Sequence, residues 1–271
     1  MTNDDVEKYK HSLKAVVTHI TRNHPELFSD VVDQVRALVS DYVKDHHKNT
    51  VAYGPFKGLR LSDDAHWGMS DHGTMVLGIY EQEILNELSD ISPRRKTFIN
   101  LGAGDGYYPL GMLVAGLCER SYCFEISELG CAIIAKSAVA NGVQDRVAVV
   151  VGEAKPDFYK SIPRDELSDS VVLVDIEGAE FDIMTDDVFA AFGKSILIIE
   201  IHEFVDDIVQ KYNRLKRASA ATHTARKITT ASRDMSVFPE LAKLTDNNRW
   251  LLCSERRPHL MSWLRFDPIA P

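Results

Sequence analysis

The sequence has few cysteines and no long apolar run. Its 271 residues include only four cysteines, Cys118, Cys123, Cys131 and Cys253, and no two of them form a CxxC pair. This spacing argues against a zinc site or a disulfide framework and favours buried, reduced thiols. No apolar stretch approaches membrane-spanning length, and the acidic start of the chain lacks the apolar core of a signal peptide. We therefore predict a cytoplasmic protein without a membrane span.

An excess of positive charge is also missing. The chain carries 31 lysines and arginines against 40 aspartates and glutamates, a formal net charge of −9. Because nucleic-acid affinity depends largely on lysine and arginine neutralising phosphates, we predict no nucleic-acid partner. With 45% hydrophobic and 26% charged residues, the composition is that of an ordinary globular protein with a substantial core.

The first 90 residues differ in pattern from the remainder. Apolar residues recur at helical spacing over residues 4–48, an irregular segment rich in glycine and aromatics covers residues 50–70, and residues 73–88 again suggest a helix. We predict a helical extension and acceptor-side loop over residues 1–90 and a second domain over 91–271. The amphipathic N-terminal helices could pair two subunits, so a homodimer is one prediction.

Strands and helices alternate from residue 97 onward, which predicts a mostly parallel sheet covered on both faces. Helices are expected from Pro109, Leu129, Ala179 and Val205. The last two strands are separated by a short gap, which predicts a terminal antiparallel hairpin. The expected strands are 97–101, 121–126, 147–151, 171–176, 195–201, 249–254 and 260–266.

A glycine-rich turn follows the first of these strands. Residues 100–106 read NLGAGDG, and the apolar run after Tyr107 and Tyr108 predicts a helix. Such a strand, turn and helix bring the backbone close to a nucleotide-like cofactor. Glu125 ends the next strand, where a carboxylate can bind a ribose diol. NAD and S-adenosylmethionine both carry that ribose, so these residues alone leave both cofactors open.

Several segments resemble one enzyme family. The NLGAGDG turn resembles the first motif of class I S-adenosylmethionine-dependent methyltransferases, with Asn100 where that motif usually has an acidic residue. VDIEGAEFD at 174–182 and IEIHE at 199–203 resemble the FkbM family of methyltransferases. YGPFKG at 53–58, LGIYE at 77–81 and SERRP at 254–258 are similar to segments of its O-antigen-cluster members. The resemblance covers about residues 50–268.

This resemblance implies a Rossmann-like class I methyltransferase fold with seven strands, S-adenosylmethionine as cofactor, and a saccharide hydroxyl in polysaccharide biosynthesis as methyl acceptor. Alternatives are a secondary-metabolite hydroxyl, an NAD-dependent oxidoreductase and a non-catalytic cofactor-binding partner protein. The predicted cofactor-binding residues are Tyr80, Glu81, Asn100, Gly102, Ala103, Gly104, Gly106, Tyr107, Tyr108, Glu125, Ile126, Glu153, Ala154 and Asp175.

Transfer of a methyl group to a hydroxyl requires removal of the hydroxyl proton. Asp175, Glu200 and His202 follow or end neighbouring strands, and we predict them as catalytic residues. His202 is the preferred general base because imidazole titrates near neutral pH. The same three side chains could instead hold Mg²⁺. We favour a site without a metal.

Candidates for the acceptor site come from the region before the first strand and from the segments that follow the fifth strand. Trp67 could support a sugar ring, or simply anchor its loop. The basic stretch from Lys211 to Lys227 could clamp a diphosphate, or be a solvated helix face. The predicted acceptor-binding residues are His66, Trp67, His72, Glu203, Arg226, Glu255 and Arg257.

Overall fold

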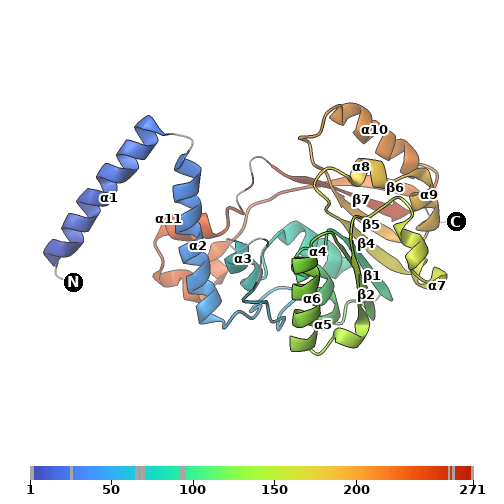
Figure 1. The fold of residues 1–271 in the computed structure, drawn as a ribbon, viewed down its shortest axis with the longest axis horizontal. Helices are drawn as coiled ribbons and strands as arrows, with labels where there is room; N and C mark the ends of the chain where they lie inside the picture. Colours follow the sequence, from blue (N-terminus) through green and yellow to red (C-terminus); the bar gives the residue numbers. More distant parts are fainter. Residues whose placement is uncertain are drawn as a thin grey trace.

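The computed structural model describes residues 3–24, 27–64, 67, 71–91, 95–255, 257 and 260–269. A single seven-stranded sheet organises the chain, with its strands in the order β3-β2-β1-β4-β5-β7-β6 (Figure 1). The strands are β1 (Thr97–Leu101), β2 (Arg120–Glu125), β3 (Val147–Val151), β4 (Ser170–Val174), β5 (Ile196–Glu200), β6 (His223–Thr229) and β7 (Ser262–Pro268).

The first five strands run parallel, and β7 runs antiparallel to both of its neighbours, β5 and β6. The predicted Rossmann-like α/β fold with seven strands and an antiparallel end is therefore confirmed. The strand order reverses direction between β1 and β4, where the crevice of an open α/β sheet binds its ligand. The carboxyl ends of β1, β2, β4 and β5 thus meet at one edge of the sheet.

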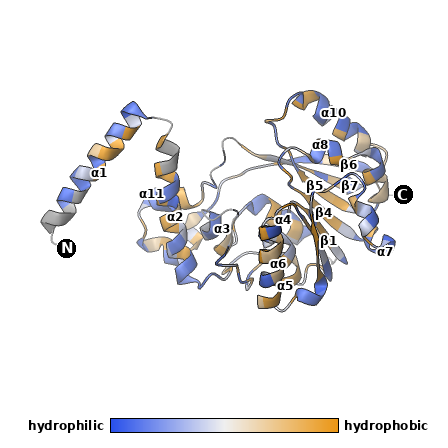
Figure 2. Cartoon of the chain, viewed as in Figure 1, coloured by the Kyte–Doolittle hydropathy of each residue, from blue (hydrophilic) through white to orange (hydrophobic). Residues whose placement is uncertain are grey.

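Helices cover both faces of the sheet (Figure 1). Phe98 and Leu173 face α4 (Gln82–Asp90), α5 (Tyr107–Val114) and α6 (Glu128–Ala140). Ile99 and Val172 face the side covered by α7 (Arg164–Leu167), α8 (Glu180–Ile183), α9 (Asp186–Ala191) and α10 (Ile208–Ser219). This alternation is the two-residue period of a strand buried on both faces, and Figure 2 shows the strands at the centre of the body as hydrophobic. The other helices are α1 (Asn3–Asn23), α2 (Phe28–His46), α3 (His72–Val76) and α11 (Asp246–Leu252).

A second, smaller core lies beside the sheet. Val39 and Val43 of α2 pack with Val76 and Leu77 after α3, and with Leu252 of α11. The chain between β6 and β7 thus returns to cover the N-terminal region, while α1 extends away from the body (Figure 1). None of the described helices combines the length and apolar character needed to cross a bilayer.

Two predicted elements are wrong. Residues 249–254 belong to the end of α11 and the turn after it, because the Thr245 side chain caps a helix by accepting the Asn248 N–H. The antiparallel partner of β7 is β6, which no apolar run marks because only His223 and Ile228 of this edge strand are buried. The link between β6 and β7 is residues 230–261, not a short hairpin turn.

The helix predicted over residues 73–88 is interrupted. It divides into α3 and α4 around a turn in which Gly78 (φ +68°) and Glu81 (φ +44°) adopt left-handed conformations. Helical spacing of apolar residues continues across this turn, which is why periodicity alone missed the break. The break places Tyr80 and Glu81 next to the carboxyl edge of the sheet.

Candidate active site

A cavity of about 360 Å³ opens at the carboxyl ends of β1, β2, β3 and β4. Seven of the residues predicted to bind the cofactor line it, and they come from four strand ends. The remaining walls are mostly apolar. The seven are Gly102, Gly104, Glu125, Ile126, Glu153, Ala154 and Asp175, and they are joined by Trp67, Phe124, Gly152, Ile176, Glu177, Ala179 and Ile183.

The glycine turn is held in place by Glu125. Its Oε2 accepts the Gly104 N–H at 2.7 Å, and its Oε1 accepts the Ser127 N–H at 2.8 Å. Gly102 (φ +78°) passes so close to β4 that an added Cβ would lie 1.7 Å from the Asp175 carbonyl oxygen. The close approach of these two strand ends therefore requires glycine.

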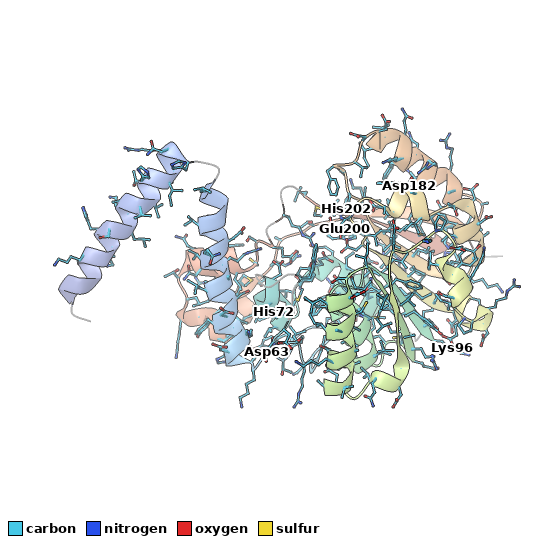
Figure 3. All side chains as sticks on the ribbon, in the orientation of Figure 1. Asp63, His72, Lys96, Asp182, Glu200 and His202 are labelled. Atoms are coloured by element: carbon cyan, nitrogen blue, oxygen red, sulfur yellow. The ribbon has the colours of Figure 1, made fainter. Side chains whose placement is uncertain are left out.

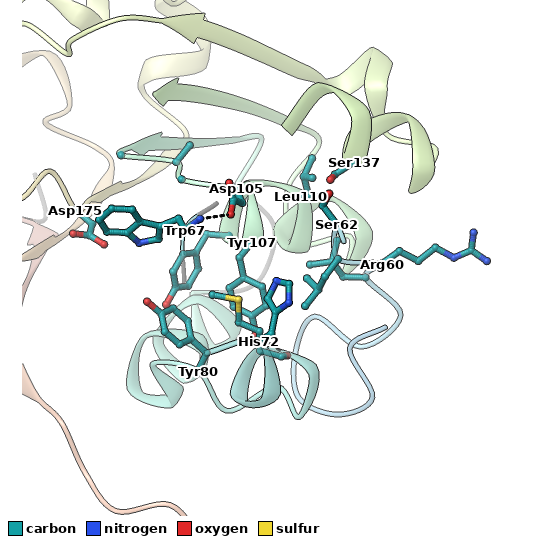
Figure 4. A pocket seen from close by; sticks show the side chains of 18 residues that line it. Arg60, Ser62, Trp67, His72, Tyr80, Asp105, Tyr107, Leu110, Ser137 and Asp175 are labelled. Atoms are coloured by element: carbon teal, nitrogen blue, oxygen red, sulfur yellow. Dashed lines mark hydrogen bonds between the residues drawn. The ribbon is translucent and has the colours of Figure 1, made fainter. Parts of the chain in front are cut away.

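A smaller cavity, of about 70 Å³, adjoins the first on the side of α3. Figure 4 shows the Trp67 indole beside Asp175, and the backbone N–H of Trp67 donates to Asp105 Oδ2 at 2.8 Å. Trp67 lines both cavities and lies over Gly104, 3.7 Å from the position of an added Cβ. Predicted residues that line this smaller cavity are Trp67, His72, Tyr80, Gly102, Ala103, Gly104, Gly106, Tyr107, Tyr108 and Asp175.

The larger cavity is strongly acidic. Four acidic side chains line it: those of Glu125, Glu153, Asp175 and Glu177. Among its described lining residues there is no lysine or arginine. The local charge therefore favours a cationic ligand and opposes an anionic one.

The three predicted catalytic residues come together at the edge of the larger cavity. His202 Nε2 lies 3.6 Å from Asp175 Oδ1 and 3.5 Å from Glu177 Oε2. In Figure 3, Glu200 and His202 lie side by side, far from Lys96, which precedes β1 at the opposite edge. Glu200 and His202 are buried, whereas the Asp175 side chain is about one-third exposed and lines both cavities.

Burial and mutual repulsion change the acidity of this cluster. Burial first, and the Glu81 carboxylate second, raise the pKa of Asp175 to about 7. Burial and the neighbouring Asp175 also raise the pKa of Glu200 well above its ordinary value. Burial alone would lower the pKa of His202, but the Glu180 hydrogen bond and the nearby carboxylates outweigh it, so the pKa is raised.

Arg257 joins the cluster to the loop before α4. Its guanidinium donates to Glu200 Oε1 at 3.2 Å and also donates to Glu81 Oε1. The second oxygen of Glu81 accepts the Tyr108 hydroxyl at 2.6 Å. Glu81 and Arg257 are therefore engaged with each other behind Tyr80, and neither lines the described cavities.

A divalent cation has a geometric candidate here. One ligand atom each from Asp175, Glu200 and His202 lie within 4.8 Å of one another. This arrangement fits the alternative set of ligands, although Glu200 already accepts a hydrogen bond from Arg257. A reaction that needs no metal stays our prediction.

Other predicted residues lie outside the two cavities. Glu203 is 3.9 Å from Lys227, Arg226 pairs with Glu87, and Glu255 Oε1 accepts from Arg233 at 2.9 Å. His66 is not among the described residues. Asn100 is buried within β1: its Nδ2 contacts backbone oxygens at 3.4–3.5 Å, and its Oδ1 has no hydrogen-bond partner in the described part of the chain.

Two residues beside His202 were not assigned a role from the sequence. Glu180, fully buried, contacts His202 Nδ1 at 3.2 Å. Phe204 is 64% exposed and its ring lies edge-on to the imidazole at 5.4 Å. The spacing of Glu180 within the DIEGAE segment gave no indication of this contact, because it depends on how the turn after β4 folds back onto β5.

Comparison with known proteins extends to the fold only. No family model matches the chain, and no curated protein matches it. A protein of the NADB-Rossmann superfamily from Streptococcus agalactiae is 12% identical, with a TM-score of 0.47, over 71% of this chain and 69% of its own.

Two other solved structures similar to this chain are of methyltransferases. The m1A22 tRNA methyltransferase of B. subtilis is 10% identical, with a TM-score of 0.42, over 67% of this chain and 64% of its own. An O-methyltransferase from Bacillus cereus in complex with SAH is 16% identical, with a TM-score of 0.39, over 64% and 74%. Similarity of this extent concerns the fold alone, so the resemblance to the FkbM family rests on the sequence motifs.

Proposed function

We propose that this protein is an S-adenosylmethionine-dependent O-methyltransferase that acts on a hydroxyl of a saccharide or glycan precursor. The observation that carries the proposal is the acidic cavity at the switch point of the sheet, next to Asp175, Glu200 and His202. S-adenosylmethionine supplies an electrophilic methyl group on a positively charged sulfur. The electrostatics of the cavity match that charge.

The same charges oppose the NAD alternative. Near a protein surface, two negative unit charges about 4 Å apart repel each other by about 4 kcal/mol. A dinucleotide would bring two phosphates into a cavity with four carboxylates and, among its described lining residues, no cationic side chain. We therefore place NAD-dependent oxidoreduction behind methyl transfer.

The residues present fit S-adenosylmethionine. Glu125 stands where it could accept hydrogen bonds from the ribose, and Glu153 with Ala154 would border the adenine. Gly102 and Gly104 keep the cavity floor free of side chains, so that the ligand can approach the backbone closely. Because Glu81 is buried against Arg257, the predicted contact of this loop with the cofactor would come from Tyr80, which lines the smaller cavity.

In this proposal His202 takes the hydroxyl proton. Its Nε2 faces Asp175 and Glu177, which both line the larger cavity. The imidazolium formed would lie among carboxylates that favour its charge, consistent with its raised pKa. Methyl transfer otherwise needs mainly positioning and exclusion of water, which the two adjoining cavities provide.

A neutral polyhydroxylated acceptor suits the surroundings of His202. Phe204 and Trp67 are both more than half exposed, and the apolar face of a sugar ring can pack on such aromatic surfaces. The basic stretch gives little support for a diphosphate clamp. Arg214, Arg226 and Lys227 pair with acidic side chains, and none of the three lines either cavity.

Two experiments test this function in order. Calorimetry should detect binding of S-adenosylmethionine and none of NAD⁺; the reverse result would favour the oxidoreductase. A methyl-donor assay should then be run across neutral glycosides, nucleotide sugars, secondary-metabolite phenols and tRNA, with mass mapping of products. Turnover of glycosides is expected, turnover only of the phenols or tRNA would reject the saccharide, and binding without any turnover would favour a non-catalytic partner protein.

A further inference from the structure

The buried carboxylate of Glu180 contacts three nitrogen atoms. Its Oε2 accepts the Gly178 N–H at 2.9 Å, and its Oε1 accepts the His202 backbone N–H at 3.1 Å. The same Oε1 lies 3.2 Å from His202 Nδ1. Glu180 is the first residue of α8 and is fully buried, so these contacts replace the water that a carboxylate otherwise requires.

From these contacts we infer that Glu180 is a positioning residue that fixes the tautomer and orientation of His202. A backbone N–H can only donate, so both oxygens of the Glu180 side chain act as hydrogen-bond acceptors. Oε1 can accept from His202 Nδ1 only when that nitrogen carries a proton. This contact of 3.2 Å is shorter than the 3.6 Å and 3.5 Å that separate Nε2 from Asp175 and Glu177, so the geometry favours Nδ1 as the protonated nitrogen of the neutral ring. The lone pair of the neutral imidazole is then on Nε2, on the side of Asp175 and Glu177, which line the larger cavity.

This assignment gives the two imidazole nitrogens separate roles. Nδ1 is held from behind by Glu180, while Nε2 points toward Asp175 and Glu177, which line the cavity. In many enzymes a carboxylate accepts a hydrogen bond from one nitrogen of a histidine base, which keeps the proton on that nitrogen and leaves the other free to accept a proton. The inference rests on the proposed function for the use of Nε2, but not for the location of the proton.

A purely structural role for Glu180 is the competing explanation. The turn before α8 contains Glu177 (φ +53°) and Gly178 (φ +103°), and the Glu180 side chain caps it by accepting the Gly178 N–H. If Glu180 were only a cap, its removal would reduce stability, but the tautomer of His202 would not depend on it. The test therefore needs a readout of the proton on His202.

Long-range ¹H–¹⁵N NMR on histidine-labelled protein provides that readout. The His202 signals are assigned from their absence in His202→Gln, and the neutral ring of the wild type is expected to carry its proton on Nδ1. A proton on Nε2 would overturn the inference. The tautomer itself is read on the unmodified protein, so the result does not depend on whether Glu180→Gln folds; only the assignment of the signals uses the His202→Gln variant.

Glu180→Gln then tests the consequence. An amide cannot accept on both sides, so the selection of the Nδ1–H tautomer should weaken and kcat should fall by about 10²-fold or more, with methyl-donor affinity nearly unchanged. The matched control is Glu166→Gln, which changes a partly buried glutamate that accepts from Thr97 at the opposite edge of the sheet. An unchanged tautomer and kcat in Glu180→Gln, or an equal kcat loss in the control, would overturn the inference.

Failure of the proposed function would look different. The expected tautomer in a protein that methylates no hydroxyl acceptor would leave Glu180 as the residue that positions His202, and would remove only the methyltransferase assignment.

Discussion

Replacement of Gly102 by alanine should damage both the fold and the cofactor site. The φ of +78° costs an L-residue about 1–2 kcal/mol. The new Cβ would also lie 1.7 Å from the Asp175 carbonyl oxygen, although carbon atoms normally approach to about 3.5–4.0 Å. The ends of β1 and β4 would have to separate by about 2 Å.

That separation acts on an ordered part of the sheet. The Asp175 N–H donates to the Leu101 carbonyl at 3.0 Å, and Val174 is in register with Leu101. Loss of this hydrogen bond adds about 1 kcal/mol, and the forced displacement of a well-packed element adds about 1–3 kcal/mol. We expect the free energy of unfolding to fall by about 3–6 kcal/mol.

Gly104→Ala is the matched control. Gly104 also has a positive φ, of +54°, but an added Cβ would meet nothing closer than Trp67 at 3.7 Å. Only the backbone cost of about 1–2 kcal/mol should apply. Affinity for S-adenosylmethionine should nevertheless decrease, because Gly104 lines both cavities and the added methyl group would lie beside Trp67, which also lines both. Urea denaturation measures stability, and calorimetry measures binding. A loss below about 1 kcal/mol in Gly102→Ala, or equal losses in both variants, would refute the reasoning.

Three further changes probe the charged cluster. His202→Ala should leave methyl-donor affinity nearly unchanged in calorimetry and lower turnover by about 10²-fold or more; a comparable loss of affinity would contradict its role as base. The raised pKa of about 7 at Asp175, caused first by burial, means that the folded state binds more protons than the unfolded state, so stability should fall as pH rises from about 4 to about 7. Asp175→Asn should flatten that part of the curve of melting temperature against pH. Glu200 and Glu255, whose pKa values burial also raises, will retain some slope, and an unchanged slope would show that Asp175 does not titrate in this range. EDTA should leave turnover unchanged, whereas a loss restored by Mg²⁺ would assign Asp175, Glu200 and His202 to a cation.

The central sheet was predictable because its strands are marked by their own composition. Val171 to Val174 form a continuous apolar run, as expected of a strand buried on both faces, and turn residues separate it from its neighbours. β6 has no such mark, because four of its seven residues are exposed in a row at the sheet edge. The helical cap at Thr245 decided the structure of the following apolar residues, which periodicity alone could not assign.

The candidate site was predictable to the extent that strand order determines it. Asp175 and Glu200 had to meet because parallel neighbouring strands place their carboxyl ends at one edge. Partners brought in by loops were not predictable. Arg257 reaches Glu200 from the segment after α11, and Glu180 reaches His202 through a turn with two left-handed residues.

The distribution of charge also bears on how the site would distinguish donor from product. Glu125, Glu153, Asp175 and Glu177 attract a cationic ligand, and this attraction weakens once the ligand has lost its positive charge. In the proposed reaction the proton released from the acceptor hydroxyl would stay on His202, which lies among Glu180, Asp175 and Glu177. The positive charge would thus pass from the ligand to the protein, so the cavity would hold the spent, neutral ligand less tightly than the charged one that entered. His202 is therefore well placed to assist release of the product as well as to accept the proton.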